Sequence, residues 1–525
     1  MTMTSASMIA SATLTATTAL PYHMAPVIAT TGGKVQGYWQ TGSSAAYLGI
    51  PFAAAPVGPR RFAAPTAPEP WDGVRPAMAY GPTPQRRPFG SPIVTIPEPS
   101  IPGESTLNVN VFTPAPNDRD AHLPVYVWIH GGGYFAGSPA SPWYNGRAFN
   151  ASGVVTVTIS YRLGFDGFGW MDGAPLNRGL LDQIAALEWV QDNIVAFGGD
   201  PDRVTIGGQS AGGGSVLALL ASPRAHGLFR GAISESGAFG TPTAEQAVAG
   251  GRALAERIGV EPTREAWLTV GAETILDNER EVNHAEGVPG NVVDADSLID
   301  ALRGGSICDN GMIFVPVADG DVLPETQWDA FRNGMGSDVA LFMGSNRNEF
   351  SFPMPGGPSL DDVCAALAKA GISEKPIRRF ANGVLRIGED RVAGQFVTAW
   401  TFRVGLAYLA ALRARSGAGS RTWAYDFAQM SSISNVSAHC EEIPYAFNLL
   451  DAENVTNVLG AGASQPLADA MHDTWVRFIT DGSLTSPSAD DNDAYGALRF
   501  QGGGASYDAD AYRFEHEVLS AAGVL

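Results

Sequence analysis

The feature that most constrains this chain is a Gly-x-Ser-x-Gly turn between an apolar run and a helix-compatible segment. Residues 204–207 lead into Gly208-Gln209-Ser210-Ala211-Gly212, and residues 215–220 continue in a helix-compatible pattern. A serine held between a strand and a helix needs a turn too sharp for flanking side chains, which accounts for both glycines. The chain contains 62 glycines, so a glycine-rich turn without chemistry is the alternative, and the rest of the sequence must decide.

Apolar patterns elsewhere predict an α/β fold with a central, mostly parallel sheet flanked by helices. Between residues 125 and 240, strand patterns alternate with helical ones, as in sheets covered by helices on their faces. Two more polar segments, about 241–310 and 351–420, are predicted to be helical excursions from the sheet. The predicted strands are 107–112, 125–129, 154–161, 231–234, 339–343 and 423–427, and the predicted helices are 180–197 and 467–480.

We expect one domain over residues 30–525, preceded by a disordered tail over residues 1–29. The tail has no Lys, Arg, Asp or Glu, and therefore lacks the charged start of a secretory signal. A true start at Met24 and a weak export signal are the alternatives, so whether residues 1–23 belong to the mature protein stays open. Residues 82–103 are rich in proline and predict a long surface loop, and the segment after residue 484 is predicted to be loop-like.

Composition excludes several classes of function. The net charge of −20 disfavours nucleic acid and anionic membranes as partners. The chain has no apolar run long enough to cross a membrane. Its three cysteines form no CxxC pair and its eight histidines form no His-Glu-x-x-His motif, so we expect no metal and no cofactor.

Two residues are candidates to activate Ser210. A serine hydroxyl needs a histidine base, which is itself oriented by a carboxylate. In parallel-sheet hydrolases these groups follow in the order serine, acid, histidine, each in a loop after a strand. Glu349 follows the predicted strand 339–343, and His439 follows the strand 423–427. The alternatives are a solvated acid and an ordinary loop histidine.

The run His130-Gly131-Gly132-Gly133 follows another predicted strand. Successive glycines let the backbone come close to a substrate and direct several N–H groups at one point. With the N–H of Ala211, those of Gly132 and Gly133 would form an oxyanion hole with three donors. A flexible hinge is the alternative, but two glycine motifs at strand ends favour chemistry.

Taken together, these stretches resemble type B carboxylesterases, of the carboxylesterase/cholinesterase family of α/β-hydrolases. The matching stretches run in order over about residues 30–485, which is far more specific than the serine turn alone. They are residues 52–62, 107–114, 130–133, 160–164, 177–183, 197–201, 209–213, 316–320, 344–349 and 439–445.

The resemblance implies the α/β-hydrolase fold and a serine esterase acting on small-molecule esters, with Ser210 as nucleophile, Glu349 as acid and His439 as base. Gln209 and His439-Cys440-Glu441 are similar to bacterial members that hydrolyse carbamates such as phenmedipham. A carbamate or amide hydrolase with the same triad is therefore one alternative. A non-catalytic binding member of the family is another, although every required group is present.

The sequence departs from the family pattern at two places. Thr83 and Thr106 stand where many members have a disulfide pair, which suggests a cytoplasmic protein, with secretion as the alternative. Gln209 stands where most members have glutamate before the serine, which disfavours a preference for cationic choline esters. A monomer or weak homo-oligomer is expected, although the sequence does not determine the oligomeric state.

Overall fold

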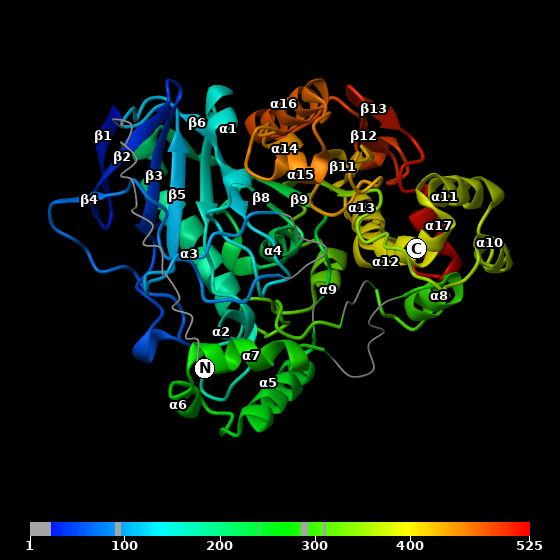
Figure 1. Cartoon of the computed structure of the whole chain (residues 1–525), viewed down its shortest axis with the longest axis horizontal. Coiled ribbons are helices and arrows are strands. Elements are labelled where there is room, and N and C mark those ends of the chain that lie inside the picture. The colour runs from blue at the N-terminus through cyan, green and yellow to red at the C-terminus, as the bar shows by residue number, and fades with distance from the viewer. Residues whose placement is uncertain (1–22, 90–95, 241, 285–291, 308–310) are drawn as a thin grey trace, which may run out of the picture.

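A large twisted sheet forms the centre of the protein in a computed structural model that describes residues 23–89, 96–240, 242–284, 292–307 and 311–525 (Figure 1). Neighbouring strands follow the order β1-β2-β3-β5-β7-β6-β8-β9-β10-β11-β12-β13, and β4 pairs with β2. The strands are β1 His23–Thr30, β2 Gly33–Thr41, β3 Ser44–Pro51, β4 Val74–Pro76, β5 Asn108–Thr113, β6 Leu123–Ile129, β7 Val155–Ile159, β8 Gly199–Gln209, β9 Gly231–Glu235, β10 Ala340–Asn346, β11 Thr422–Phe427, β12 Ala497–Gln501 and β13 Gly504–Asp508.

The middle of the sheet is parallel and its edges are antiparallel. The strands from β7 through β6, β8, β9, β10 and β11 to β12 pair in parallel. The pairs β1–β2, β2–β3, β3–β5, β5–β7 and β12–β13 are antiparallel. The predicted mostly parallel sheet is therefore confirmed, and the carboxyl ends of β6, β8, β10 and β11 lie along one edge.

Helices cover both faces of the sheet, as strand alternation requires. On β6, Val125 and Val127 point into one apolar core, while Tyr126 and Trp128 point into the other. The first core includes side chains of α3 and α4, and the second includes those of α14 and α16. These helices are α3 Arg178–Asn193, α4 Ala211–Leu220, α14 Ile443–Ala446 and α16 Gln465–Asp481, and α1 Arg147–Ala151, α2 Gly164–Phe168 and α15 Val455–Leu459 lie in the connections.

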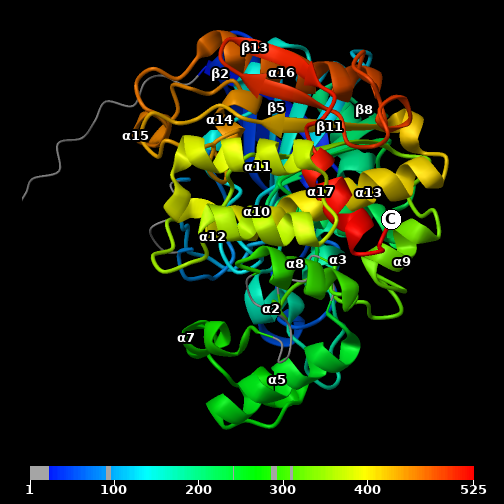
Figure 2. The ribbon, with the colours of Figure 1, turned by 90° about the vertical axis from the view of Figure 1, so that its right-hand side faces the viewer.

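The remaining helices lie mainly in the two segments where helical excursions are predicted. Figure 2 shows α10, α11 and α17 together on one side of the molecule, while α5 and α7 extend below the sheet. The helices are α5 Ala244–Ile258, α6 Arg264–Trp267, α7 Ala272–Val282, α8 Ala295–Arg303, α9 Gln327–Arg332, α10 Leu360–Lys369, α11 Glu374–Ile387, α12 Val392–Thr398, α13 Val404–Arg415 and α17 Arg513–Ala521. A π-helical turn, Ala399–Arg403, joins α12 to α13.

Both ends of the chain differ from the sequence-based expectation. Residues 23–29 do not belong to a disordered tail, because they form most of β1, which pairs with β2. Residues 1–22 lie outside the described residues. The segment after residue 484 is not loop-like, because β12 and β13 extend the sheet and α17 packs on α11 and α13. The strands that the sequence did not predict, β1, β12 and β13, lie at the edges of the sheet. Their faces are partly open to solvent, so their sequences show little apolar alternation.

Among the described residues, no helix combines the length and the apolar character needed to cross a bilayer.

Candidate active site

Ser210 lies at the tip of the sharp turn between β8 and α4. Its backbone has φ 58° and ψ −123°, a strained conformation for a residue with a side chain. A Cβ on Gly208 would collide with the backbone of Gly212, and a Cβ on Gly212 would collide with the Ile129 carbonyl. The predicted strand–turn–helix geometry is therefore confirmed, and the two flanking glycines are steric requirements of it.

Glu349 and His439 are brought together at the same edge of the sheet. His439 Nδ1 lies 2.5 Å from Glu349 Oε2, and the His439 N–H donates to the Glu349 carbonyl oxygen at 3.1 Å. The other carboxylate oxygen of Glu349 accepts the Asn346 N–H at 2.7 Å. The Glu349 side chain is fully buried and that of His439 is nearly so, which makes their contact a short, water-excluded one.

The alternative acids are engaged elsewhere. Asp426 is buried in ion pairs with Arg347 and Arg403. Glu442 accepts a hydrogen bond from Asn346 Nδ2, and burial raises its pKa to about 7. Among the described carboxylates, the one in hydrogen-bond contact with His439 is that of Glu349.

The surroundings of His439 decide how readily it holds a proton. Burial alone would lower the pKa of His439, but anionic neighbours more than reverse this and raise its pKa well above the usual value. Cys440 would act in that direction only as a thiolate, and burial raises the pKa of its thiol. We therefore attribute the raised pKa of His439 to the Glu349 carboxylate. The rings of Phe350 and Phe402, each 4.9 Å away, limit the access of water to the imidazole.

A small cavity of about 20 Å³ joins the serine turn, the histidine loop and the glycine run. Its lining includes Gly132, Ser210 and His439. Gly133 and Ala211 are not among its lining residues, but each directly follows one that is, Gly132 or Ser210. No described residue accepts a hydrogen bond from the N–H groups of Gly132, Gly133 or Ala211, so all three donors are available to a bound oxyanion. The remaining lining residues are Phe89, Ile96, Glu98, Gly131, Gly137, Ser138, Tyr144, Gln209 and Cys440.

His130 holds the glycine run 131–133 in place through a hydrogen bond. It is fully buried, its Nδ1 lies 2.8 Å from the Gly131 carbonyl oxygen, and its ring stacks on Tyr161 at 4.7 Å. Burial lowers the pKa of His130 to about 4, so the ring is neutral near pH 7 and Nδ1–H donates to that carbonyl. His130 is therefore a structural residue of this loop and does not reach the cavity.

Gln209 and Cys440 make a contact that the sequence did not reveal. The Cys440 thiol donates to Gln209 Oε1 at 3.2 Å, which turns the amide nitrogen towards His439 Nε2 at 3.4 Å. Asn346 was missed as well, although it holds Glu349 through its N–H and Glu442 through its side chain. The position of Asn346 at the end of β10, three residues before Glu349, is the one signal that could have identified it.

The two segments that carry a disulfide in many family members are joined here by hydrogen bonds. Thr83 and Thr106 are buried, and Asn108 Nδ2 donates to the carbonyl oxygens of Pro82 at 2.8 Å and Ser105 at 3.0 Å. Cys364 and Cys440 are free thiols, and Cys308 lies outside the described residues.

We therefore expect the melting temperature to be the same with and without dithiothreitol. Reduction of a native disulfide would remove about 2–5 kcal/mol of stability, which a thermal scan resolves easily. A lower melting temperature in the reduced sample would contradict this expectation.

Because Cys440 adjoins His439, a bulky thiol reagent that reaches it should slow ester hydrolysis, and Cys440→Ser should abolish that sensitivity.

Comparison with known proteins places the chain in a family. The model of the carboxylesterase family matches residues 24–366. The para-nitrobenzyl esterase of Bacillus subtilis (strain 168) is 35% identical over 473 residues, which cover 87% of this chain and 90% of that protein. The phenmedipham hydrolase of Pseudarthrobacter oxydans is 32% identical over 485 residues, covering 88% and 91%.

Solved structures agree with this assignment. A PNB esterase structure superposes with a TM-score of 0.74 at 29% identity, covering 94% of this chain and 99% of that one. The Geobacillus stearothermophilus carboxylesterase EST55 gives the same TM-score, identity and coverage. On this evidence, the chain belongs to the carboxylesterase family, has the α/β-hydrolase fold and is a carboxylic ester hydrolase.

Proposed function

We propose that Ser210, His439 and Glu349 are the catalytic triad of a serine carboxylesterase, and that Gly132, Gly133 and Ala211 form its oxyanion hole. The observation that carries this proposal is the 2.5 Å contact between His439 Nδ1 and Glu349 Oε2, at the cavity that the strained Ser210 also lines. A buried acid–histidine pair beside a strained serine is the arrangement that acyl transfer needs.

The reaction proceeds in two half-reactions with one set of groups. Ser210 Oγ attacks the acyl carbon of the ester while its proton passes to His439 Nε2, and the negative charge on the former carbonyl oxygen meets the three backbone N–H groups. The carbon–oxygen bond then breaks, and His439 gives the proton to the leaving alcohol. Water attacks the acyl-enzyme in the same way and releases the acid. Each donor of the oxyanion hole contributes roughly 10²–10³ in rate.

We expect side chains around the cavity to move when a substrate enters. The described side chains leave a cavity of about 20 Å³, roughly the space of one water molecule, so we expect part of its wall to shift when an ester binds. Phe89 is the clearest candidate, because it lines the cavity and stacks on Phe135 at 5.2 Å while remaining partly exposed.

The polarity of the cavity favours neutral esters. Gln209 places a neutral amide next to Ser210, where a carboxylate would attract a cation. Glu98 also lines the cavity, but Arg86 lies beside it, and burial raises the pKa of its carboxyl. The protein's net charge of −20 acts from a distance, and physiological salt screens it beyond about 8 Å. Groups inside the cavity should therefore decide selectivity.

We expect a p-nitrophenyl ester and an uncharged ester matched in size to butyrylcholine to be hydrolysed with higher kcat/KM than butyrylcholine itself. The comparison is made at low and high salt, with Gln209→Glu as the matched variant that restores a carboxylate and should shift the ratio towards the choline ester. A choline preference of the wild type that persists at high salt would contradict the expectation and direct attention to Glu98.

Aryl carbamates should be assayed alongside these esters, because one relative is a phenmedipham hydrolase. Ester turnover without carbamate turnover supports the carboxylesterase function, whereas the reverse would favour a carbamate hydrolase.

We further propose a cytoplasmic location, which the threonines in place of the disulfide pair and the free buried thiol of Cys440 support.

A further inference from the structure

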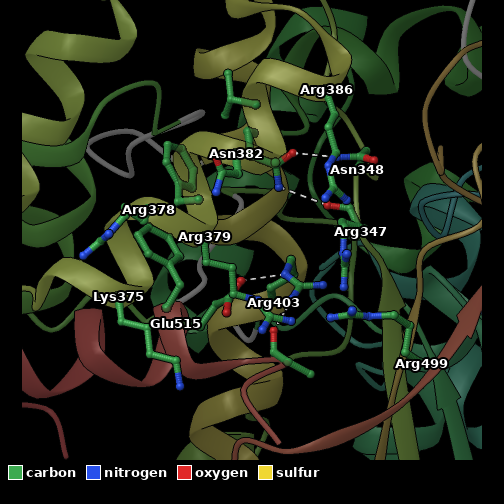
Figure 3. Close-up of a pocket in the computed structure, with 16 residues that line it drawn as sticks. Arg347, Asn348, Lys375, Arg378, Arg379, Asn382, Arg386, Arg403, Arg499 and Glu515 are labelled. Carbon is green, nitrogen blue, oxygen red and sulfur yellow. Dashed lines mark hydrogen bonds and ion pairs between the residues drawn. The ribbon is translucent and has the colours of Figure 1, made fainter. Parts of the chain in front are cut away.

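A second, much larger cavity lies away from Ser210, and it is strongly basic. It has a volume of about 480 Å³ and shares no lining residue with the small cavity at the proposed active site. Its walls come from α11, α17, the π-helical turn before α13 and the loop after β10 (Figure 3). Seven basic side chains line it, namely Arg347, Lys375, Arg378, Arg379, Arg386, Arg403 and Arg499, beside the carboxylate of Glu515.

This gathering of cations is unusual for so acidic a protein. The whole chain has 33 Lys and Arg residues and a net charge of −20, yet seven of its cations share one cavity. They come from four parts of the chain that folding brings together, around residues 347, 375–386, 403 and 499. Like charges repel strongly at short range where water is partly excluded, so the fold must balance this repulsion.

Internal carboxylates balance only part of the charge. Asp426, fully buried, pairs with three of the arginines, and four more acids pair with the others. The pairs are Asp426 with Arg347, Arg403 and Arg499; Glu515 with Arg403; Asp508 with Arg379 and Arg499; Asp510 with Lys375; and Glu374 with Arg378. Five carboxylates therefore face seven cations, which leaves an excess of two positive charges.

Two arginines of α11 are the least engaged of the seven cations. Arg386 is exposed and makes no hydrogen bond or ion pair with any residue that the structure describes. Arg378 pairs with Glu374 one turn away on the same helix, but both side chains are largely exposed, so this pair contributes little. The Arg386 guanidinium is therefore free to bind a ligand, and the Arg378 guanidinium can exchange its weak, exposed pair with Glu374 for one.

The cations deeper in the cavity are not fully satisfied either. Burial lowers the pKa of Arg499 to about 10, and the nearby charges of Arg347 and Arg379 act in the same direction. In Figure 3 the side chains of Arg347 and Arg499 lie next to each other on one side of the cavity, and both pair with Asp426. One carboxylate does not balance two guanidinium groups, so a further anion in the cavity would offset the remaining repulsion.

The shape and chemistry of the cavity define the ligand. Guanidinium groups present planar, forked donors that match the oxygens of carboxylates and phosphates. Phe380, Val384 and Phe514 add an apolar wall, and the volume is that of a site for a small organic molecule. We propose that this cavity is a binding site for a small organic anion with at least two negative charges, held by Arg386 and Arg378 at its mouth.

The site adjoins the loop of the proposed triad acid without being part of it. Arg347 and Asn348 line the cavity and directly precede Glu349, whose carboxylate turns the other way to His439. The proposal concerns binding, so its test does not require ester hydrolysis and can fail or succeed independently of the proposed function.

Isothermal titration of the full chain with inorganic pyrophosphate and, separately, with citrate tests the site. We expect saturable one-to-one binding of at least one probe, weakened by salt. Arg386→Gln should raise its Kd about tenfold, the loss of one charge-assisted contact. Arg119→Gln is the matched control, because Arg119 is also exposed and without a described partner, but lies in the turn after β5. It should leave Kd unchanged.

Each outcome of these titrations either supports or overturns the proposed anion site. Binding of pyrophosphate alone identifies a phosphorylated ligand class, and binding of citrate alone identifies polycarboxylates; either supports the site. No saturable binding of either probe overturns it. An equal loss of affinity in Arg119→Gln, or full affinity in the double variant Arg378→Gln/Arg386→Gln, also overturns it. Both arginines are exposed, so unchanged melting temperatures should show that the variants fold.

Discussion

Ser210→Ala is expected to abolish ester hydrolysis and to leave the folded protein intact. The substitution removes the proposed nucleophile, and in serine hydrolases the loss of that one atom lowers kcat by about 10⁶. The hydroxyl makes no protein hydrogen bond among the described residues, so its removal leaves no buried group unpaired. The rate is measured with p-nitrophenyl acetate, and the fold is followed by far-UV circular dichroism and thermal melting.

The control for this experiment is Ser520→Ala, which removes an exposed serine on α17 far along the chain. It should hydrolyse the ester at the wild-type rate. If Ser210→Ala retained near wild-type activity, the proposed mechanism would be wrong, whatever the family of the chain.

Glu349→Gln should lower kcat by about 10⁴ with a much smaller change in KM, because the amide cannot hold His439 in the required tautomer or stabilise its charged form. The side chains are nearly equal in volume, so the substitution tests charge rather than packing. Steady-state kinetics with a neutral ester gives both constants. Glu442→Gln is the matched comparison, since Glu442 is also buried but bonds Asn346 instead of His439.

The pH dependence of the same variant distinguishes an electrostatic role from a structural one. His439 must be neutral to accept the proton of Ser210, so kcat/KM falls as the pH drops through the pKa of His439. Glu349 raises that pKa, and the wild-type acid limb should therefore lie above the usual histidine value of about 6.5. Without the carboxylate, burial should dominate and lower the pKa, which moves the limb to lower pH.

A pH profile of Glu349→Gln that keeps the wild-type midpoint would argue against this role for Glu349. A loss of activity no larger than that in Glu442→Gln would do the same, and would make Glu442 and Asp426 the next acids to test.

The sequence by itself determined the parallel core of the fold and the chemistry at its edge. The central strand β6 is a nearly continuous apolar run, the second half of β8 is buried, and Ser210 lies in a turn that only flanking glycines allow. Because each strand of a parallel sheet ends at the same edge, residues that follow such strands are brought together by topology. The meeting of Glu349 and His439, from loops after β10 and β11, could therefore be predicted from their order alone.

The sequence did not predict the elements whose structure depends on pairing with neighbouring strands rather than on a local pattern of residues. Residues 23–29 and the strands β12 and β13 belong to the edges of the sheet, with faces open to solvent and no clear alternation to detect. These strands form because β2 and β11 offer hydrogen-bonding partners, which a local reading of the chain does not contain.

Only the tertiary structure decided which polar groups face one another. The contact of Cys440 with Gln209 joins residues on separate loops, and the basic cavity joins four segments between Arg347 and Arg499. Charge–charge energies depend on distances of a few ångströms and on burial, and neither follows from spacing along a chain. The reacting groups could thus be named from the sequence, whereas the pKa of His439 and the excess positive charge beside α11 arise from packing.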